Sequence, residues 1–237
     1  MRAQHLDTNF GRVWLVLNPL LLAGVYFILV DILRHGHRKP HYLPHLIAGI
    51  FAYYFVSGTI RQGAKAVTKG GNLVLNTAFP RILLPASSVI DNFMRFLPTL
   101  GIYAVIHVIS GLPIGPSLLL IIPIVVMLTG VAAGISMFVS ALQVYFRDLA
   151  QFLPYILRMW LYLSPVLWFA NEAPHGFKWL IWVNPIGPLL AAWSDILING
   201  QVPSLLLFVS GLLWMVGSVV VGTLFFMSRE REFAVRL

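Results

Sequence analysis

The feature that most constrains this chain is a run of 51 residues, from Phe96 to Phe146, without a single Asp, Glu, Lys or Arg. A helix rises about 1.5 Å per residue, so this run would reach more than twice the thickness of a bilayer core. It must therefore cross a membrane at least twice, and Gly111–Pro116 supplies turn residues between the crossings. A second charge-free run separates Asp195 from Arg229. The chain is expected to be embedded in a membrane.

Apolar segments of spanning length recur along the whole chain, which is 59% apolar and only 10% charged. A soluble domain of this length needs a more charged surface to stay in solution. We therefore expect an all-α membrane protein with a single transmembrane domain over residues 1–237. The predicted transmembrane helices, about six in number, lie at 14–33, 44–63, 87–109, 117–142, 149–170 and 204–227.

Three segments outside these spans predict shorter helices. Residues 1–13 mix charged and apolar side chains, which is typical of an amphipathic helix at the inner membrane interface. Residues 61–87 begin with basic side chains, are punctuated by glycine and proline, and can hold a short helix around 73–79. Residues 171–203 contain apolar runs too short to span, so we expect one or two re-entrant or interfacial helices on the outer side.

The net charge of +8 comes from basic residues that lie mostly in segments on one side of the predicted membrane. An even number of spans places both termini on that side, and the positive-inside rule makes it the cytoplasm. The segment Arg34–His41 is basic on the opposite side but does not reverse the balance. Basic clusters between apolar spans indicate membrane topology, so we expect no nucleic-acid partner.

The polar residues do not form a recognisable catalytic set. None of the eight acidic residues lies in the middle of a predicted span, and the sequence has no Gly-x-x-x-x-Gly-Lys-Ser/Thr phosphate loop and no cysteine. We expect no enzymatic activity and no metal or cofactor bound by this chain. Four histidines cluster near the outer side, and we interpret them as part of a solvated loop rather than a metal or pH-sensing site, because no carboxylate or cysteine completes a ligand set: His35, His37, His41 and His45.

Three charged residues fall within the inner parts of two predicted spans. Asp91 and Arg95 are four residues apart, hence on one helix face, and Arg158 lies in the fifth span. Charged side chains inside a bilayer usually face protein or water, which favours a cytoplasmic gate. The alternative is that these side chains extend to the inner headgroups. The sequence leaves both open.

The fifth span and its flanks carry many aromatic residues. Tyr155, Met159, Tyr162, Val166 and Phe169 share one helical stripe. Aromatic faces bind the C–H edges of sugars without requiring one particular sugar sequence, so Tyr155, Tyr162 and Phe169 are candidates to line a channel for a polymer. Ordinary packing and lipid-facing aromatics remain the alternative.

Two spans carry patterns of small residues four apart, which let helices approach closely. They are Gly130–Gly134 in the fourth span and Ser218–Gly222 in the sixth. Such patterns occur at subunit interfaces and within chains, and contact within the chain is the more common case.

Four motifs, in order along the chain, resemble those of one membrane family. The first lies in residues 6–20 and includes Gly11, Trp14, Asn18 and Pro19, and the second is FPRILLPAS at 79–87. The third is YFRDL at 145–149, followed by YLSP at 162–165, and the fourth is Asn184-Pro185. The set resembles the ABC-2 type permeases of bacteria that export O-antigen, teichoic acid and capsule polysaccharides.

That resemblance implies two copies of this permease around one channel in the bacterial cytoplasmic membrane, with two copies of an ABC ATPase subunit that bind ATP and Mg²⁺. The implied substrate is a polysaccharide on a polyprenyl diphosphate lipid. A short coupling helix between the second and third spans, at about residues 72–81, would contact the ATPase, and the loop at Arg147 and Asp148 would be a second contact. Asp148 has an alternative role as a cap of the fifth span. The implied coupling residues of the first contact are Asn72, Leu75, Phe79, Pro80 and Arg81.

Three other functions compete with polysaccharide export. An ABC-2 exporter of a small hydrophobic drug or lipid is the nearest. A membrane-embedded glycosyl- or acyltransferase would need a polar catalytic cluster, which the acidic residues do not provide. A passive channel would need no ATPase partner.

Overall fold

The computed structural model describes residues 14–33, 39–71 and 79–236, and over these residues the chain is helical with no β-strand. The all-α prediction is confirmed. The predicted interfacial helix at 1–13 and the predicted coupling helix around 73–79, apart from Phe79, lie outside the described residues. The described helices are α1 (Trp14–Leu33), α2 (Tyr42–Ala64), α3 (Ala66–Lys69), α5 (Leu83–Ile109), η1 (Pro116–Leu120), α6 (Ile121–Tyr145), α7 (Leu149–Leu163), η2 (Ala170–Glu172), η3 (His175–Phe177), α8 (Trp179–Val183), α9 (Gly187–Leu197), α10 (Leu205–Arg229), η4 (Glu230–Glu232) and α11 (Phe233–Arg236).

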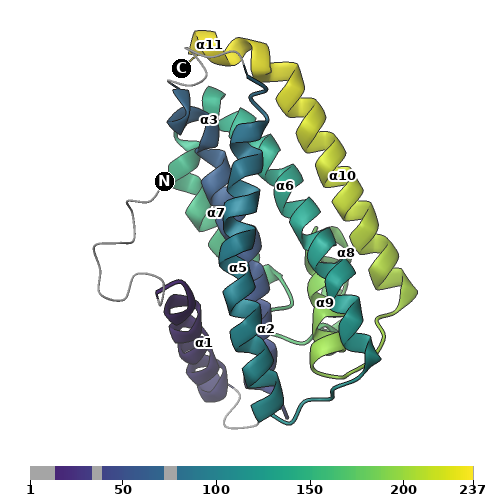
Figure 1. The fold of residues 1–237 in the computed structure, drawn as a ribbon. Coiled ribbons are helices and arrows are strands. Elements are labelled where there is room, and N and C mark those ends of the chain that lie inside the picture. The colour runs from purple at the N-terminus through teal and green to yellow at the C-terminus, as the bar shows by residue number, and fades with distance from the viewer. Residues whose placement is uncertain (1–13, 34–38, 72–78, 237) are drawn as a thin grey trace.

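The long helices run side by side in an elongated bundle with α2 at its centre (Figure 1). Among the described residues, four helices are long and apolar enough to cross a membrane: α2, α5, η1 with α6, and α10 with η4. The helix α1 is also apolar and has 20 residues, about the number that a membrane-spanning helix needs. Four of the six predicted spans therefore coincide with helices that have the length and composition of a membrane span, and the number of crossings stays a prediction.

The fifth predicted span, 149–170, is wrong in its second half. The helix α7 ends at Leu163, and Ser164 takes an extended backbone conformation. The residue before a proline is disfavoured in the helical region, so Pro165 explains the break. The 15 residues of α7 rise about 22 Å, less than the roughly 30 Å of a bilayer core.

The outer segment folds into short helices, as the sequence predicts, and one of them is inside the bundle. The helix α9 contacts α2, α6 and α10. Trp193 on α9 is 2% exposed and donates its indole N–H to the carbonyl of Ala48 at 3.2 Å. This packing fits a re-entrant helix rather than an interfacial one.

Small residues allow α6 and α10 to pack closely against each other. A side chain at Gly222 would overlap the backbone of Gly134, and a side chain at Gly134 would overlap the backbone of Ser218. Gly130 faces Met215 in the same interface. The small-residue patterns therefore mediate contact within the chain, which is the more common of the two alternatives.

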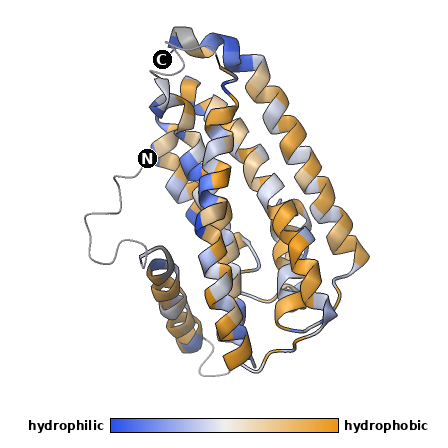
Figure 2. Ribbon diagram, in the orientation of Figure 1, coloured by the Kyte–Doolittle hydropathy of each residue, from blue (hydrophilic) through white to orange (hydrophobic). Residues whose placement is uncertain are grey.

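Polar residues gather at one end of the bundle, where α3, α11 and the C-terminus lie (Figures 1 and 2). We call it the C-terminal end. The connection from α2 into α3 and the connection from α6 to α7 are also here, whereas the α5–α6 and α9–α10 connections lie at the opposite end. The described residues of the two segments that the sequence predicts to contact an ATPase, 79–81 and 147–148, therefore lie at one end.

Candidate functional site

The first candidate site is a polar crossbridge between α2 and α5. Arg95 and Asp91, one turn apart on α5, form an ion pair with 3.2 Å between Nη2 and Oδ2. Gln62 on α2 donates its Nε2 to the same carboxylate at 2.8 Å. The Oε1 of Gln62 accepts a hydrogen bond from Asn92 Nδ2 at 2.9 Å. These four side chains connect the central helix to α5 near the surface of the bundle, where Gln62 is exposed and the other three are partly buried.

Aromatic packing and a glycine bring the two helices together at this crossbridge. Phe55 stacks on Phe96 with ring centroids 4.8 Å apart and meets Phe93 edge-on at 6.0 Å. At Gly58 of α2, an added side chain would meet Asn92 Oδ1 at 3.0 Å. The missing side chain lets α5 approach closely enough for the amide contacts.

The structure brings together two of the three predicted gate residues. Asp91 and Arg95 are paired, whereas Arg158 is exposed on α7 and forms no ion pair within the described part of the chain. Gln62 and Asn92 are the polar partners that sequence reasoning missed. Gln62 is an uncharged residue near a predicted span end, and its partner lies 29 residues away, so no local pattern indicated it.

The second candidate site is the exposed face of α7. Tyr155 is 68% exposed and Tyr162 47% exposed, with Met159 between them on the same face. Tyr26 of α1 donates its hydroxyl to that of Tyr162 at 3.1 Å, and the two rings meet edge-on. This face presents aromatic rings and the Arg158 guanidinium together.

The predicted aromatic stripe does not continue to Phe169. Because α7 ends at Leu163, Val166 and Phe169 are not on its exposed face, and both are buried. Phe169 stacks on the His45 ring with 4.0 Å between centroids. The assignment of Phe169 to a channel lining is wrong, whereas the positions of Tyr155 and Tyr162 agree with such a role.

The histidines of the outer side do not share one environment. His45 is buried in the first turn of α2, with its Nδ1 2.9 Å from Ser194 Oγ, so it is not part of a solvated loop. His41 is exposed, and His35 and His37 lie outside the described residues. Over the described chain, no three His, Cys, Asp or Glu side chains are grouped as a metal site would need.

The third candidate site is at the C-terminal end, where residues 230–236, here called the C-terminal segment, contact two motifs. Arg81 Nη1 donates to the carbonyl of Glu230. Tyr145 donates its hydroxyl to Glu232 Oε2 at 2.8 Å, and Arg147 Nη2 donates to the carbonyl of Arg236 at 3.2 Å. The FPRILLPAS and YFRDL motifs thus both bond to the same segment.

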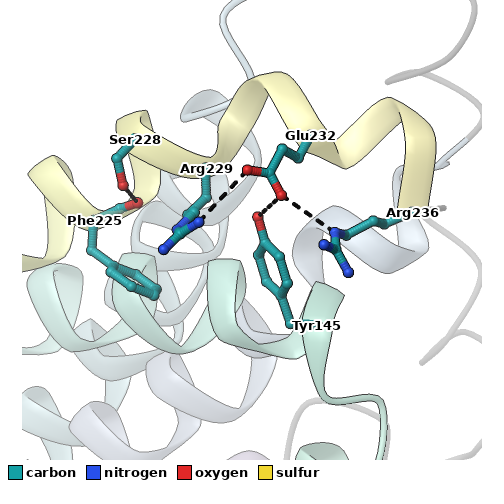
Figure 3. Close-up of polar contacts among 6 residues, drawn as sticks. All are labelled: Tyr145, Phe225, Ser228, Arg229, Glu232 and Arg236. Atoms are coloured by element: carbon teal, nitrogen blue, oxygen red, sulfur yellow. Dashed lines mark hydrogen bonds and ion pairs between the residues drawn. The ribbon is translucent and has the colours of Figure 1, made fainter.

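Charged side chains hold the C-terminal segment over Tyr145 (Figure 3). Glu232 lies 3.6 Å from Arg229 Nη1 and 3.4 Å from Arg236 Nε. The guanidinium of Arg236 is 4.4 Å from the centre of the Tyr145 ring. These surface ion pairs are individually weak, but they share one carboxylate and one ring and so fix a single arrangement.

An apolar anchor lies beneath these charges. Phe233 is fully buried and meets Phe226 edge-on at 5.2 Å between ring centroids. It belongs to a small core, separate from the main one, that joins the C-terminal segment to α3, α6 and α10. Its other buried members are Val67, Ala141 and Val144.

The remaining predicted coupling residues occupy the surface or lie outside the described chain. Pro80 is exposed and Phe79 is partly buried, whereas Asn72 and Leu75 lie outside the described residues. Asp148 is exposed at the N-terminus of α7, where its side chain makes no capping hydrogen bond. Its position as the N-cap residue of α7 agrees with the alternative that its charge interacts with the N-terminus of this helix, and the choice between the two roles stays open.

Comparison of the sequence with known protein families shows the family to which this chain belongs. The family model for ABC-2 type transporters matches residues 3–198, most of the chain. This chain belongs to the ABC-2 type transporter family. The ABC-2 membrane chain is a transport component, which agrees with the expectation of a non-enzymatic role.

Curated relatives of this ABC-2 chain carry one shared name. Two proteins of Klebsiella pneumoniae, each named O-antigen export system permease protein RfbA, are 26% identical to it; one alignment covers 92% of this chain and 85% of the relative, the other 84% and 77%. A protein of the same name from Myxococcus xanthus is 25% identical over 99% of this chain and 90% of the relative.

Proposed function

We propose that this chain is the channel-forming permease subunit of an ATP-driven exporter of cell-surface polysaccharide in a bacterial cytoplasmic membrane. Its ABC-2 family and relatives named O-antigen export permease support this function. One geometric observation carries it: Arg81 and Arg147, from the two segments proposed to face an ATPase, lie at the same end of the bundle and contact the same seven-residue segment. A single partner surface can therefore reach both.

The C-terminal end is proposed to be cytoplasmic. Basic residues are concentrated there, as the positive-inside rule requires of the cytoplasmic side. At the opposite end, the described lysines and arginines are Lys39 and Lys178. Those at or near the C-terminal end belong to the end of α2, to α3 and the residue before it, to the residues before α5, to the α6–α7 connection and to the chain from the end of α10 onward: Arg61, Lys65, Lys69, Arg81, Arg147, Arg229, Arg231 and Arg236.

The exposed face of α7 is proposed to line a channel formed with a second copy of this chain. An arginine at membrane depth is costly against lipid, by about 2.5–3.5 kcal/mol on insertion scales, so Arg158 favours a water-filled surface. Tyr155 and Tyr162 on that face offer rings to the apolar edges of sugars. A polymer on a polyprenyl diphosphate lipid would pass between the two copies.

The crossbridge between α2 and α5 is proposed to act as the cytoplasmic gate. The ATPase subunits would bind ATP and Mg²⁺, whereas this chain would bind no cofactor. Movement of their contact segments would reach α5 directly, because Arg81 precedes its first residue by two positions. Opening would then be a population shift between two arrangements of Gln62, Asp91 and Arg95.

The first test is purification of the tagged chain from its native membrane in mild detergent. We expect an ATPase subunit to co-purify stoichiometrically, with hydrolysis that vanadate inhibits. In proteoliposomes, the complex should move polyprenyl-diphosphate-linked polysaccharide in an ATP-dependent manner. Transport of a fluorescent lipid or drug without polysaccharide would support the small-molecule exporter instead. Purification without any ATPase would reject the exporter and revive the channel or transferase.

A pair of substitutions tests the proposed cytoplasmic contact. Arg81→Glu should lower ATP-dependent export about fivefold or more, the lower range of coupling energies between sites, because it reverses a charge at the proposed partner surface. Phe79→Ala should act in the same direction. Lys178→Glu makes the same type of charge reversal at the opposite end and should leave export unchanged. Equal export by Arg81→Glu and Lys178→Glu would contradict the assignment.

A further inference from the structure

The C-terminal segment connects two parts of the molecule that the sequence places far apart. Arg81 is 149 residues from Glu230, and Tyr145 is 87 residues from Glu232. One bond reaches the segment before α5, and the other reaches the end of α6, just before the turn into α7. Among the contacts that the structure describes, this segment joins the two proposed ATPase-facing regions from one side.

The bonds to the C-terminal segment fix its backbone as well as its side chains. Arg81 and Arg147 both donate to main-chain carbonyls, of Glu230 and Arg236, which lie at its two ends. The carbonyl of Glu230 also accepts the backbone N–H of Phe233, so Arg81 occupies its second acceptor position. Arg236 is the last residue of α11, where carbonyls lack partners within the helix and an arginine can satisfy them. The segment is therefore held at both ends, by one arginine from each region.

Its middle is held by burial. Phe233 is fully buried, meets Phe226 of α10 edge-on, and belongs to the same buried cluster as Val67 of α3 and Val144 of α6. Burying a phenylalanine removes a large apolar surface from water and so stabilises the position of the segment that carries it. A chain end that frays would not keep an aromatic side chain buried in this way. The buried cluster therefore connects the C-terminal segment and α10 to the two proposed ATPase-facing regions.

We propose that residues 230–236 are a brace that makes the two ATPase-facing regions move as one body, with Glu232 and Phe233 as its positioning residues. The proposal rests on the proposed exporter function, because it assumes that an ATPase contacts the regions of Arg81 and Arg147. Without the brace, the partner would move one region relative to the other, and less of its motion would reach the α2–α5 crossbridge. The sequence motifs alone assign no role to this segment.

The direct test measures the distance between the two regions in the assembled complex. The chain contains no cysteine, so two introduced cysteines can be spin-labelled without background. Leu83→Cys at the start of α5 and Gln151→Cys in the first turn of α7 are exposed labelling positions outside the brace. We expect one narrow distance distribution, unchanged between nucleotide-free and vanadate-trapped complexes.

Phe233→Ala should broaden that distribution or make it depend on nucleotide, and it should lower the polysaccharide moved per ATP hydrolysed about three- to tenfold. Phe233→Leu, which keeps an apolar anchor, should restore most of both. Glu232→Gln and Tyr145→Phe remove one charge or one hydroxyl at the surface and should have smaller effects in the same direction. These two also decide the question if Phe233→Ala fails to fold.

Ser228→Ala is the matched control on the same part of the chain (Figure 3). Ser228 is exposed and bonds only locally, to the carbonyl of Phe225 at 2.8 Å, so its loss should change neither readout. The brace is overturned if Phe233→Ala and Glu232→Gln both match Ser228→Ala in distance and in transport per ATP. Because that result would be obtained in a complex that still exports, it would leave the exporter function standing. Failure to isolate an ATPase complex would reject the exporter function itself.

Discussion

Two helices of this bundle, α2 and α10, are both long enough to cross a membrane, but they differ in how far the rest of the protein buries them. The spanning window of α2 is 78% buried inside the protein, whereas that of α10 is 11% buried. The mean hydropathy runs in the opposite direction, 1.4 for α2 and 2.3 for α10. The more apolar helix is the more exposed one.

The difference in burial between α2 and α10 is explained by the lipid that surrounds a membrane protein. Lipid tails are as apolar as leucine, so an apolar helix gains little by leaving them, whereas polar groups must be satisfied within the protein. The helix α2 accordingly carries Tyr53, Thr59 and Gln62, each of which bonds inside the chain, and it contacts α1, α5, α6, α7 and α9. The helix α10 contacts the bundle mainly through α6 and α9.

The largest expected difference between the two helices is in truncation of apolar side chains. Ile50 of α2 is 0% exposed, and Ile50→Ala should destabilise the fold by about 2–5 kcal/mol because it leaves a cavity. Leu213 of α10 is 67% exposed, and Leu213→Ala should change stability by less than about 0.5 kcal/mol. Thermal unfolding of both variants in the same detergent measures the contrast. Equal melting temperatures would show that α2 is not the structural centre.

The next difference lies within α10 itself, between its narrow contact strip and its open face. Gly222 faces the backbone of Gly134, so Gly222→Ala should overpack the interface and destabilise by about 1–3 kcal/mol. Gly217 has open space around it, and Gly217→Ala should be neutral or stabilise the helix by about 0.5–1 kcal/mol. A loss of stability in both variants would mean that α10 is packed on more than one face.

The smallest expected difference concerns polar groups. Gln62→Leu removes the crossbridge from α2 to Asp91 and Asn92 and should cost about 1 kcal/mol, with a measurable change in ATP-dependent transport. Ser210 of α10 bonds only to carbonyls of its own helix, and Ser210→Ala should change neither stability nor transport. Melting temperature and export rate, measured together, separate a structural loss from a gating effect. Normal transport by Gln62→Leu would argue against the gate.

The positions of the long helices were predictable because they depend on local composition. The 51-residue charge-free run predicted two crossings with a turn at 111–116, and this run contains the second half of α5, the turn at Gly111 and α6. The predicted span at 14–33 coincides with α1. The motifs at 79–87 and 145–149 indicated the family that the comparison identifies. The end of α7 at Leu163 could also have been predicted, because Pro165 disfavours a helical conformation at Ser164, but the predicted span at 149–170 did not take this proline into account.

The amino-acid sequence was enough to predict a helical membrane protein, the positions of most of its helices and its family, because length, hydropathy and short motifs are properties of contiguous residues. The buried helix and the pairs of polar groups that meet could be identified from the three-dimensional fold alone, because both depend on residues that are distant in the chain. Gln62 with Asp91, Arg81 with Glu230 and Tyr145 with Glu232 are pairs separated by 29, 149 and 87 residues. Burial of Phe169 and Phe233 likewise depends on neighbours from distant segments, and in lipid an apolar side chain gives no sign of which side it faces.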